Sequence, residues 1–162
     1  NIPKGRGLYE PSLTKFGGRY FLTLRADHSA FVTSGKDGIH FDLIREWKFD
    51  DGQVLGSYNT QQHWMTVGGG LFLVYTRRGA DNDHIMRHRA PLFIGQVNPK
   101  TLRVIRSTER ILIPENEATL GNSGICRISA TESWVTCGEG LLRLGKRKGQ
   151  RNKVHFVKVT AE

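Results

Sequence analysis

The chain has 162 residues, of which 38% are hydrophobic and 24% are charged, a composition typical of a globular domain with its own core. No apolar run approaches the roughly 20 residues of a membrane-spanning helix, so we expect no membrane span. The net charge of +9 attracts anions, which makes acidic sugars, nucleic acids and anionic surfaces the candidate partners. The chain begins at Asn1 without a charged-then-apolar leader, which predicts a mature chain or a fragment and leaves the compartment unknown.

Strand patterns dominate the first part of the chain, and helical periodicity is weak throughout. Short apolar or alternating runs are bounded by Gly, Asn, Asp and Pro. The pair Gly17-Gly18 and the turn 35–38 separate such runs and favour hairpins. The pattern predicts four strands in an up-and-down meander, over 12–16, 19–26, 29–34 and 39–43.

Two further units repeat this rhythm. The second is predicted over 62–67, 71–77, 90–97, 102–105 and 110–113, and the third over 123–129, 133–137, 141–144 and 154–159. Residues 71–75 are apolar on both faces, as in a strand buried between sheets. The three units predict an all-β fold of β-propeller blades in one domain, with boundaries near 8–48, 60–114 and 119–162. A two-sheet sandwich is the alternative, and three blades cannot close a ring without a longer chain or further copies.

The first unit carries the phrases Glu10-Pro-Ser-Leu13, Gly18-Arg19, Leu24-Arg25 and Ser34-Gly-Lys-Asp-Gly-Ile-His-Phe41. They resemble a blade of the sialidase (neuraminidase) superfamily, with its E-P-S-like start, its G-R hairpin, an arginine at the end of the second strand and an Asp-box turn. The box is degenerate here, because Asp37 is displaced and Phe41 replaces Trp. The Asp box is structural in that family, so Asp37 is no catalytic candidate.

The resemblance extends over nearly the whole chain. Phrases at 58–64, 75–84 and 87–92 resemble a bacterial branch of sialidase-like glycosyl hydrolases to which we can attach no established substrate. The resemblance implies the last three blades of a six-bladed propeller. It also makes an extracytoplasmic location plausible.

The resemblance assigns roles to individual residues. In sialidases the corresponding glutamate pairs with the nucleophile, and the arginine belongs to a triad that binds the sugar carboxylate, which implies these roles for Glu10 and Arg25. The third arginine of the triad precedes an apolar strand, and Arg89 is the best match, with Arg87 as the fallback. A guanidinium suits this role because it offers a carboxylate a planar fork of donors and keeps its charge. The family's first arginine and its acid/base aspartate lie in blades that precede this chain.

The nucleophile position departs from the family. Asn122 stands in the segment 120–124 where sialidases have Tyr, and an amide cannot form their covalent glycosyl intermediate. Asn122 is either a ligand contact or a turn residue in the left-handed conformation. An inverting mechanism, with a water and two carboxylates, would need no nucleophile.

Residues 77–89 form the most unusual polar stretch, with four arginines, two aspartates and two histidines: Arg77, Arg78, Asp81, Asp83, His84, Arg87, His88 and Arg89. As a functional loop it would place acid–base groups, Asp83 and His84, and an anion-binding group, Arg78, at the mouth of a pocket. The alternative is a solvated connection that is neutralised internally. The spacing of these aspartates and histidines matches no metal motif, so we expect no metal here. We expect no other cofactor either.

The three tryptophans are candidates for core packing, and Trp64 with its neighbours is also a candidate for sugar binding. Gln62, His63 and Trp64 begin a predicted strand and could bind a sugar, or Trp64 could pack in the core with His63 exposed. Trp47 and Trp134 are predicted to pack in the core or between blades.

The cysteines and the basic run 145–153 give weaker signals. A turn over 130–133 would place Cys126 opposite Cys137, which leaves a cross-strand disulfide and two buried thiols both open. The basic run contains no interleaved aromatic residue for base stacking, which favours a solvated loop over a nucleic-acid site.

Together these observations predict a sialidase-like glycoside hydrolase that acts on a glycan containing an acidic sugar. Arg25 and Arg89 would bind the carboxylate, and Glu10 would perform or tune acid–base chemistry. The alternative, motivated by Asn122, is a non-catalytic propeller that binds an anionic glycan or a protein. Nucleic-acid binding through 145–153 is a third hypothesis, which the lack of aromatic residues disfavours.

Overall fold

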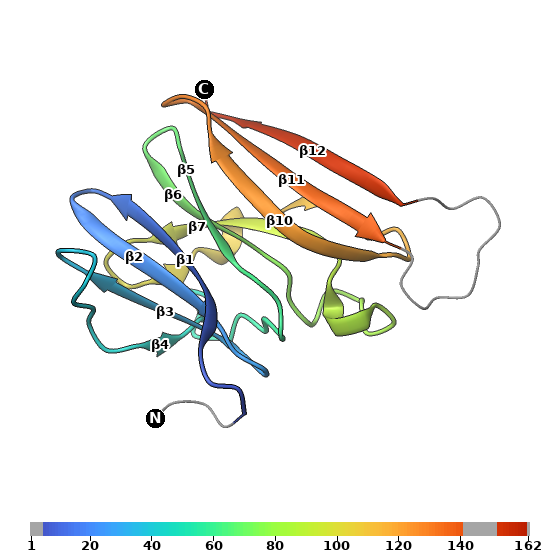
Figure 1. The fold of residues 1–162 in the computed structure, drawn as a ribbon, viewed down its shortest axis with the longest axis horizontal. Helices are drawn as coiled ribbons and strands as arrows, with labels where there is room; N and C mark the ends of the chain where they lie inside the picture. The colour runs from blue at the N-terminus through green and yellow to red at the C-terminus, as the bar shows by residue number, and fades with distance from the viewer. Residues whose placement is uncertain (1–4, 141–151, 162) are drawn as a thin grey trace.

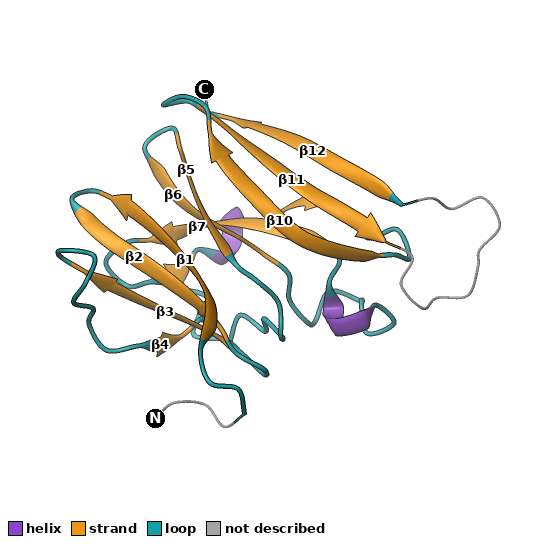
Figure 2. Cartoon of the chain, viewed as in Figure 1, coloured by secondary structure: helices purple, strands orange, loops and turns teal. Residues whose placement is uncertain are grey.

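The computed structural model describes residues 5–140 and 152–161, which form three antiparallel sheets (Figures 1 and 2). The first sheet contains β1 (Tyr9–Phe16), β2 (Arg19–Arg25), β3 (Ala30–Gly35) and β4 (Arg45–Glu46) in that order. The second contains β5 (His63–Val67), β6 (Gly70–Tyr75), β7 (Leu92–Asn98) and β8 (Arg103–Val104), and β9 (Arg110–Ile113) also pairs with β7. The third contains β10 (Thr119–Arg127), β11 (Glu132–Gly140) and β12 (Lys153–Thr160).

Two single-turn 3-10 helices, η1 (Met86–His88) and η2 (Arg106–Thr108), lie in the second unit. The described ranges contain no helix long and apolar enough to cross a membrane.

The first strands of the three sheets lie next to one another, and the remaining strands extend outward from them (Figure 1). β5 contacts both β1 and β10, so the second sheet lies between the other two. This is the arrangement of neighbouring blades in a β-propeller. The all-β, propeller-type class predicted from the sequence is therefore confirmed.

Two apolar clusters hold the sheets together. Phe21, Trp47 and Trp64 belong to the cluster between the first and second sheets, whereas Met65 and Val135 belong to the one between the second and third. Trp64 and Met65 are neighbours on β5 and point to opposite faces, as successive strand residues must. The middle sheet is thus apolar on both faces, which explains the continuous apolar run at 71–75.

The fourth strand of the first sheet differs from the prediction. Residues 39–43 form only an isolated bridge, between Gly35 and Phe41, and the strand lies at Arg45–Glu46. Asp37 explains the longer turn, because its Oδ1 accepts the backbone N–H groups of Ile39 and His40, at 2.9 and 2.7 Å. Asp37 thus stabilises the turn. The strand predicted at 141–144 lies outside the described residues.

The register of β10 and β11 corrects two expectations. Cys126 pairs with Trp134, and Cys137 pairs with Ser123, so the cysteines do not face each other and both are free. The hairpin pairs Arg127 with Ser133, three residues away from the register assumed for a turn over 130–133. Trp134 lies on the outer face with 37% of its surface exposed, so it is not a core residue, whereas Trp47 is buried as predicted.

Candidate functional site

Bulges interrupt the first strands of the outer two sheets at corresponding places. In the first sheet, Tyr9 pairs with Arg25 and Ser12 with Thr23, which leaves Glu10 inside the irregularity. A β-bulge bends its strand and redirects side chains, and bulges are common beside active sites. Glu10 also has a φ of +47°, a backbone conformation that few residues other than glycine adopt. The chain therefore holds this carboxylate in an unusual orientation.

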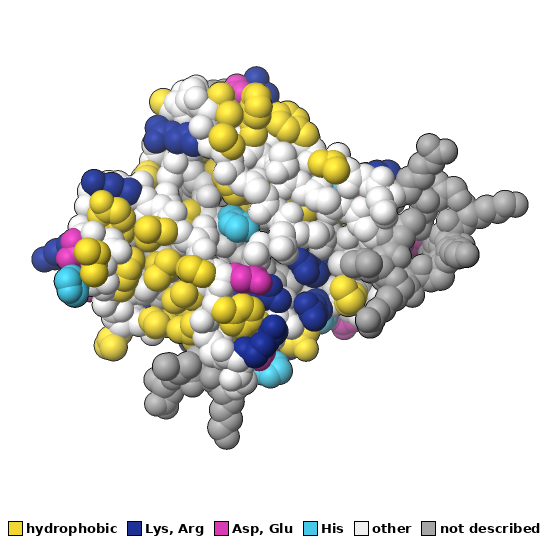
Figure 3. Space-filling model, viewed as in Figure 1, with side chains coloured by type: hydrophobic (Ala, Val, Ile, Leu, Met, Phe, Trp, Pro, Cys, Tyr) yellow, Lys and Arg dark blue, Asp and Glu magenta, His cyan; other side chains and the backbone are white. Residues whose placement is uncertain are grey.

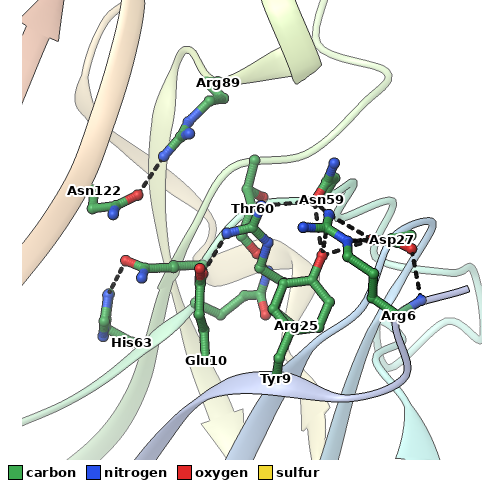
Figure 4. Close-up of polar contacts among 12 residues, drawn as sticks. Arg6, Tyr9, Glu10, Arg25, Asp27, Asn59, Thr60, His63, Arg89 and Asn122 are labelled. Atoms are coloured by element: carbon green, nitrogen blue, oxygen red, sulfur yellow. Dashed lines mark hydrogen bonds and ion pairs between the residues drawn. The ribbon is translucent and has the colours of Figure 1, made fainter.

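The third sheet repeats the feature at Asn122. Leu120 pairs with Glu139 and Ser123 with Cys137, so Gly121 and Asn122 form the bulge. Glu10 and Asn122 thus lie in matching bulges near the starts of β1 and β10. Figure 4 shows both side chains near His63, the first residue of β5.

Arg25 ends β2 and reaches across the first bulge. Its side chain is 6% exposed, and its Nη1 donates to the carboxylate of Glu10. Its Nη2 donates to Oδ1 of Asn59 at 2.7 Å, while its Nε has no hydrogen-bond partner among the described residues. The guanidinium also lies over the ring of Tyr9, 5.0 Å from the ring centroid. Buried polar groups are normally satisfied, so this unpaired Nε is an exception.

Asn59 organises a network behind Arg25 (Figure 4). Its Oδ1 accepts from Arg6 at 3.0 Å and lies 2.9 Å from the hydroxyl of Tyr9. Asp27 accepts from Nε of Arg6 at 2.8 Å, and these bonds hold the pKa of the Asp27 carboxyl below its ordinary value. Burial, followed by the hydrogen bond to Asp27, raises the pKa of Tyr9. The network fixes the direction of the Arg25 guanidinium.

Arg89 approaches from the connection between β6 and β7. Its Nη2 donates to Oδ1 of Asn122 at 2.5 Å. Burial, together with the positive charges of Arg25 and Arg87, lowers the pKa of Arg89. A bound anion beside Arg89 would relieve this repulsion. Basic side chains also gather near the centre of the molecular face drawn in Figure 3, beside an acidic one.

The structure thus brings together Glu10, Arg25, Arg89 and Asn122, with His63 beside them (Figure 4). His63 is half-buried, and its Nε2 lies 3.2 Å from Oε1 of Gln61. Burial lowers the pKa of His63, although the negative charge of Glu10 opposes this effect. A neutral imidazole is therefore favoured at this position.

Other predicted site residues have different surroundings. Within the described ranges, Asp83 pairs with His88 at 3.1 Å and His84 with Glu115 at 3.5 Å. The side chain of Asp83 is 94% exposed. The guanidinium of Arg78 covers the ring of Tyr58, 3.8 Å from its centroid.

Gln62 and Trp64 are not at the surface. Gln62 is 1% exposed and donates to the carbonyl of Thr60. Trp64 is 5% exposed and packs against Phe21 and Trp47, with ring centroids 5.9 and 5.5 Å apart. Trp64 therefore adopts the packing alternative and cannot stack on a sugar, and Gln62 is buried as well. Arg87 is exposed and has a φ of +57° in η1.

Tyr9, Asn59 and Asp27 belong to the network but were not predicted from the sequence. The position of Tyr9 could have indicated it, because it directly precedes Glu10. Asn59 lies in a connection without periodicity, and only the fold brings it to Arg25. In the described part of the chain, no group of three or more His, Cys, Asp or Glu side chains is arranged to hold a metal ion.

Comparison with known proteins finds similarity at the level of the fold. A bifunctional GH43-CE protein from Bacteroides eggerthii matches with a TM-score of 0.58 and 14% identity, over 96% of this chain and 18% of that one. A thermostable family-43 glycoside hydrolase matches with a TM-score of 0.58 and 10% identity, over 85% of this chain and 43% of that one. The K499G mutant of the NanB sialidase from Streptococcus pneumoniae matches with a TM-score of 0.55 and 15% identity, over 93% of this chain and 23% of that one.

No family model and no curated protein matches the sequence. The chain spans less than half the length of each of these three structures.

Proposed function

We propose that this chain supplies part of a sialidase-like, glycan-acting propeller that holds the carboxylate of an acidic sugar between Arg25 and Arg89. The observation that carries the proposal is the convergence of these two arginines beside Glu10 and Asn122 (Figure 4). The similarity to glycoside hydrolases and to a sialidase supports a carbohydrate as the partner. In this proposal, residues 8–48, 60–114 and 119–162 are three blades of a larger, six-bladed propeller.

Electrostatics supports an acidic sugar over a neutral one. Arg25 donates to the carboxylate of Glu10 and to the uncharged Asn59, and Arg89 donates to the uncharged Asn122. Among the residues that the structure describes, Glu10 is the carboxylate in direct contact with the pair, so two cations share a single anion. A ligand carboxylate would add the missing charge and accept hydrogen bonds from a guanidinium fork.

Glu10 is the candidate for acid–base chemistry. Its carboxyl group contacts Arg25 and is 38% exposed, so a water can reach it, as a general base requires. With Asn122 in place of the family's Tyr, a direct attack by water on the glycosidic carbon replaces the covalent intermediate. The second carboxylate of such a reaction would come from elsewhere in the assembled propeller, and Asp83 with His84 would act at the rim.

The alternative is a non-catalytic propeller that binds an anionic glycan. The hydrogen bond between Arg89 and Asn122 favours it, because an amide there orients an arginine but offers no nucleophile. The basic run 145–151, the core of the nucleic-acid hypothesis, lies outside the described residues.

One experiment separates these functions. The full-length protein is incubated with sialyllactose and with digalacturonate, binding is measured by calorimetry, and product release is followed by mass spectrometry. Turnover that is lost in Glu10→Gln while binding persists supports the enzyme. Binding without turnover in the unaltered protein supports the alternative. Arg19→Lys, at an exposed ion pair with Asp42 on the same strand as Arg25, is the matched control for the arginine variants.

Loss of acidic-glycan binding in Arg89→Lys, with binding intact in Arg19→Lys, is the expected signature of the carboxylate site. If neither acidic glycan binds, or if Arg89→Lys binds as well as the unaltered protein, the carboxylate site is wrong.

A further inference from the structure

A cavity of about 550 Å³ lies beside Arg89, between the connection that carries η1 and the third sheet. This volume is in the range of small-ligand sites. Its described lining combines charged, polar and apolar groups with exposed backbone: Met86, Arg89, Thr119, Leu120, Glu139 and Lys153, with glycines 121, 138 and 140. The cavity therefore joins the arginine cluster to a set of groups that the proposed function has not used.

Glu139 is the most unusual member of this lining. It pairs with Leu120 just before the bulge of the third sheet, as Arg25 pairs with Tyr9 before the bulge of the first. The two residues thus occupy corresponding positions with opposite charges. The side chain of Glu139 is only 4% exposed, and its carboxylate lies 3.1 Å from Nε2 of His155 and 3.7 Å from Nζ of Lys153. The carboxyl oxygens of Glu139 are hydrogen-bond acceptors held beside two basic neighbours.

Thr119 supplies an independent observation. The residue is 4% exposed, and its Oγ1 is buried without a hydrogen-bond partner among the described residues. Burying a hydroxyl without a partner costs free energy, so such groups are rare in native structures. A hydroxyl group of a ligand in the cavity would remove that cost.

We propose that this cavity is the subsite for the sugar unit that bears the carboxylate. Arg89 binds the carboxylate, Glu139 accepts a hydrogen bond from a ring hydroxyl, and the Thr119 hydroxyl bonds a second one. Met86, which is 36% exposed, provides the apolar surface on which the C–H face of a sugar ring packs. The inference rests on the proposed function, because it assigns the hydroxyl-recognising half of the same site.

Thr119→Val is the sharpest test, because the variant keeps the shape of the side chain and removes only the unpaired hydroxyl. We expect the ligand-free variant to melt at the same temperature as the unaltered protein or higher. Its affinity for whichever of sialyllactose and digalacturonate binds should fall about threefold to tenfold, the effect of one neutral hydrogen bond. Thr136→Val, at an exposed position on the outer face of β11, is the matched control and should change neither quantity.

Glu139→Gln is the second variant. An amide presents an N–H group to one of the two basic neighbours and accepts more weakly, so we expect a loss of affinity of about tenfold or more, as for a charged hydrogen bond. Because this change also weakens the contacts with Lys153 and His155, its affinity is measured only after the circular dichroism spectrum matches that of the unaltered protein. If Glu139→Gln fails to fold, the subsite is tested by the affinity of Thr119→Val alone.

These variants separate a failure of the subsite from a failure of the proposed function. If Arg89→Lys abolishes binding while Thr119→Val leaves the affinity unchanged, the carboxylate site stands and the subsite assignment is overturned. If the unaltered protein binds neither acidic glycan, the proposed function fails, and the subsite fails with it. A selective loss of affinity in Thr119→Val, without a loss of thermal stability, supports both.

Discussion

Arg25 reaches across the bulge of β1 and donates to the carboxylate of Glu10, while its second terminal nitrogen donates to Asn59. Two acceptors from distant parts of the chain therefore fix one buried guanidinium. Only a planar side chain with separate donors can satisfy both acceptors at once.

Arg25→Lys tests whether this geometry matters for binding. An ammonium group keeps the charge but is a point donor on a flexible stem, so it cannot hold Glu10 and Asn59 in the observed arrangement. We expect the affinity for the acidic glycan to fall about tenfold to a hundredfold, the range of a lost charge-assisted hydrogen bond. Calorimetric titration provides the measurement, and Arg19→Lys is the control, with its exposed contacts to Asp42 and Ser34. Equal affinities in both variants would show that charge alone is sufficient.

Glu10 and Arg25 could be singled out as site residues from the sequence, but neither the contact between them nor the rest of the network could. The resemblance to sialidases pointed to both residues, and strand alternation placed them at neighbouring strand ends. The role of Asn59 could not be predicted, because it depends on how the 16-residue connection between β4 and β5 folds back on the first sheet. Local patterns carry no information about such a contact.

Strand positions could be predicted where the apolar pattern is strong. They were harder to predict where the turn between two strands sets their register. The run at 71–75 marked a doubly buried strand because both faces of β6 pack against other sheets. The loop before β11 is different, since a shift of three residues in the hairpin moves Cys126 away from Cys137 without changing either strand's pattern much. Trp64 was ambiguous because its side chain suits a core and a sugar site equally well.

The half-buried imidazole of His63 should make folding stability depend on pH. Burial lowers its pKa, so below about pH 6.5 the unfolded chain binds a proton that the folded chain resists. The stabilisation is therefore complete above pH 6.5 and is lost as the pH falls toward the folded-state pKa. We expect the free energy of unfolding to drop more between pH 7.5 and pH 5.5 in the unaltered protein than in His63→Gln, as measured by urea titration.

The control for this pH effect is His28→Gln, at an exposed position outside the site. It should leave the difference between the two pH values as it is in the unaltered protein. If His63→Gln shows the same drop as His28→Gln, protonation of His63 does not control the stability in this range.

The two thiols should react at very different rates. Cys126 is exposed on the outer face, whereas Cys137 is buried, and burial raises the pKa of its thiol. Since the thiolate is the reactive form, we expect one equivalent of maleimide to modify the folded protein, at Cys126. Mass spectrometry of peptides before and after unfolding gives the measurement, and Cys126→Ser is the control, which should take up no reagent until it unfolds. Rapid labelling of Cys137 in the native state would contradict the packing between the second and third sheets.

Glu109 closes a buried network on the second sheet and offers a test of stability away from the site. It accepts from Nε and Nη2 of Arg77 at 2.8 and 2.7 Å and from the hydroxyl of Tyr75 at 2.6 Å. The side chains of Arg77 and Glu109 are 15% and 13% exposed. Burial alone would raise the pKa of Glu109, but the bonds from Arg77 and Tyr75 outweigh it and the pKa is lowered.

Glu109→Gln replaces one acceptor oxygen with a donor that faces other donors and leaves the Arg77 charge buried without its anion. We expect the free energy of unfolding to fall by about 2–4 kcal/mol, the range for breaking a buried charged pair. Urea titration at pH 7.5 provides the value. Glu132→Gln, which removes a more exposed contact with Lys158, is the control and should shift the unfolding midpoint far less. Equal shifts in the two variants would mean that Arg77 finds another acceptor, and the double variant Arg77→Met with Glu109→Gln would then be no more stable than Glu109→Gln alone.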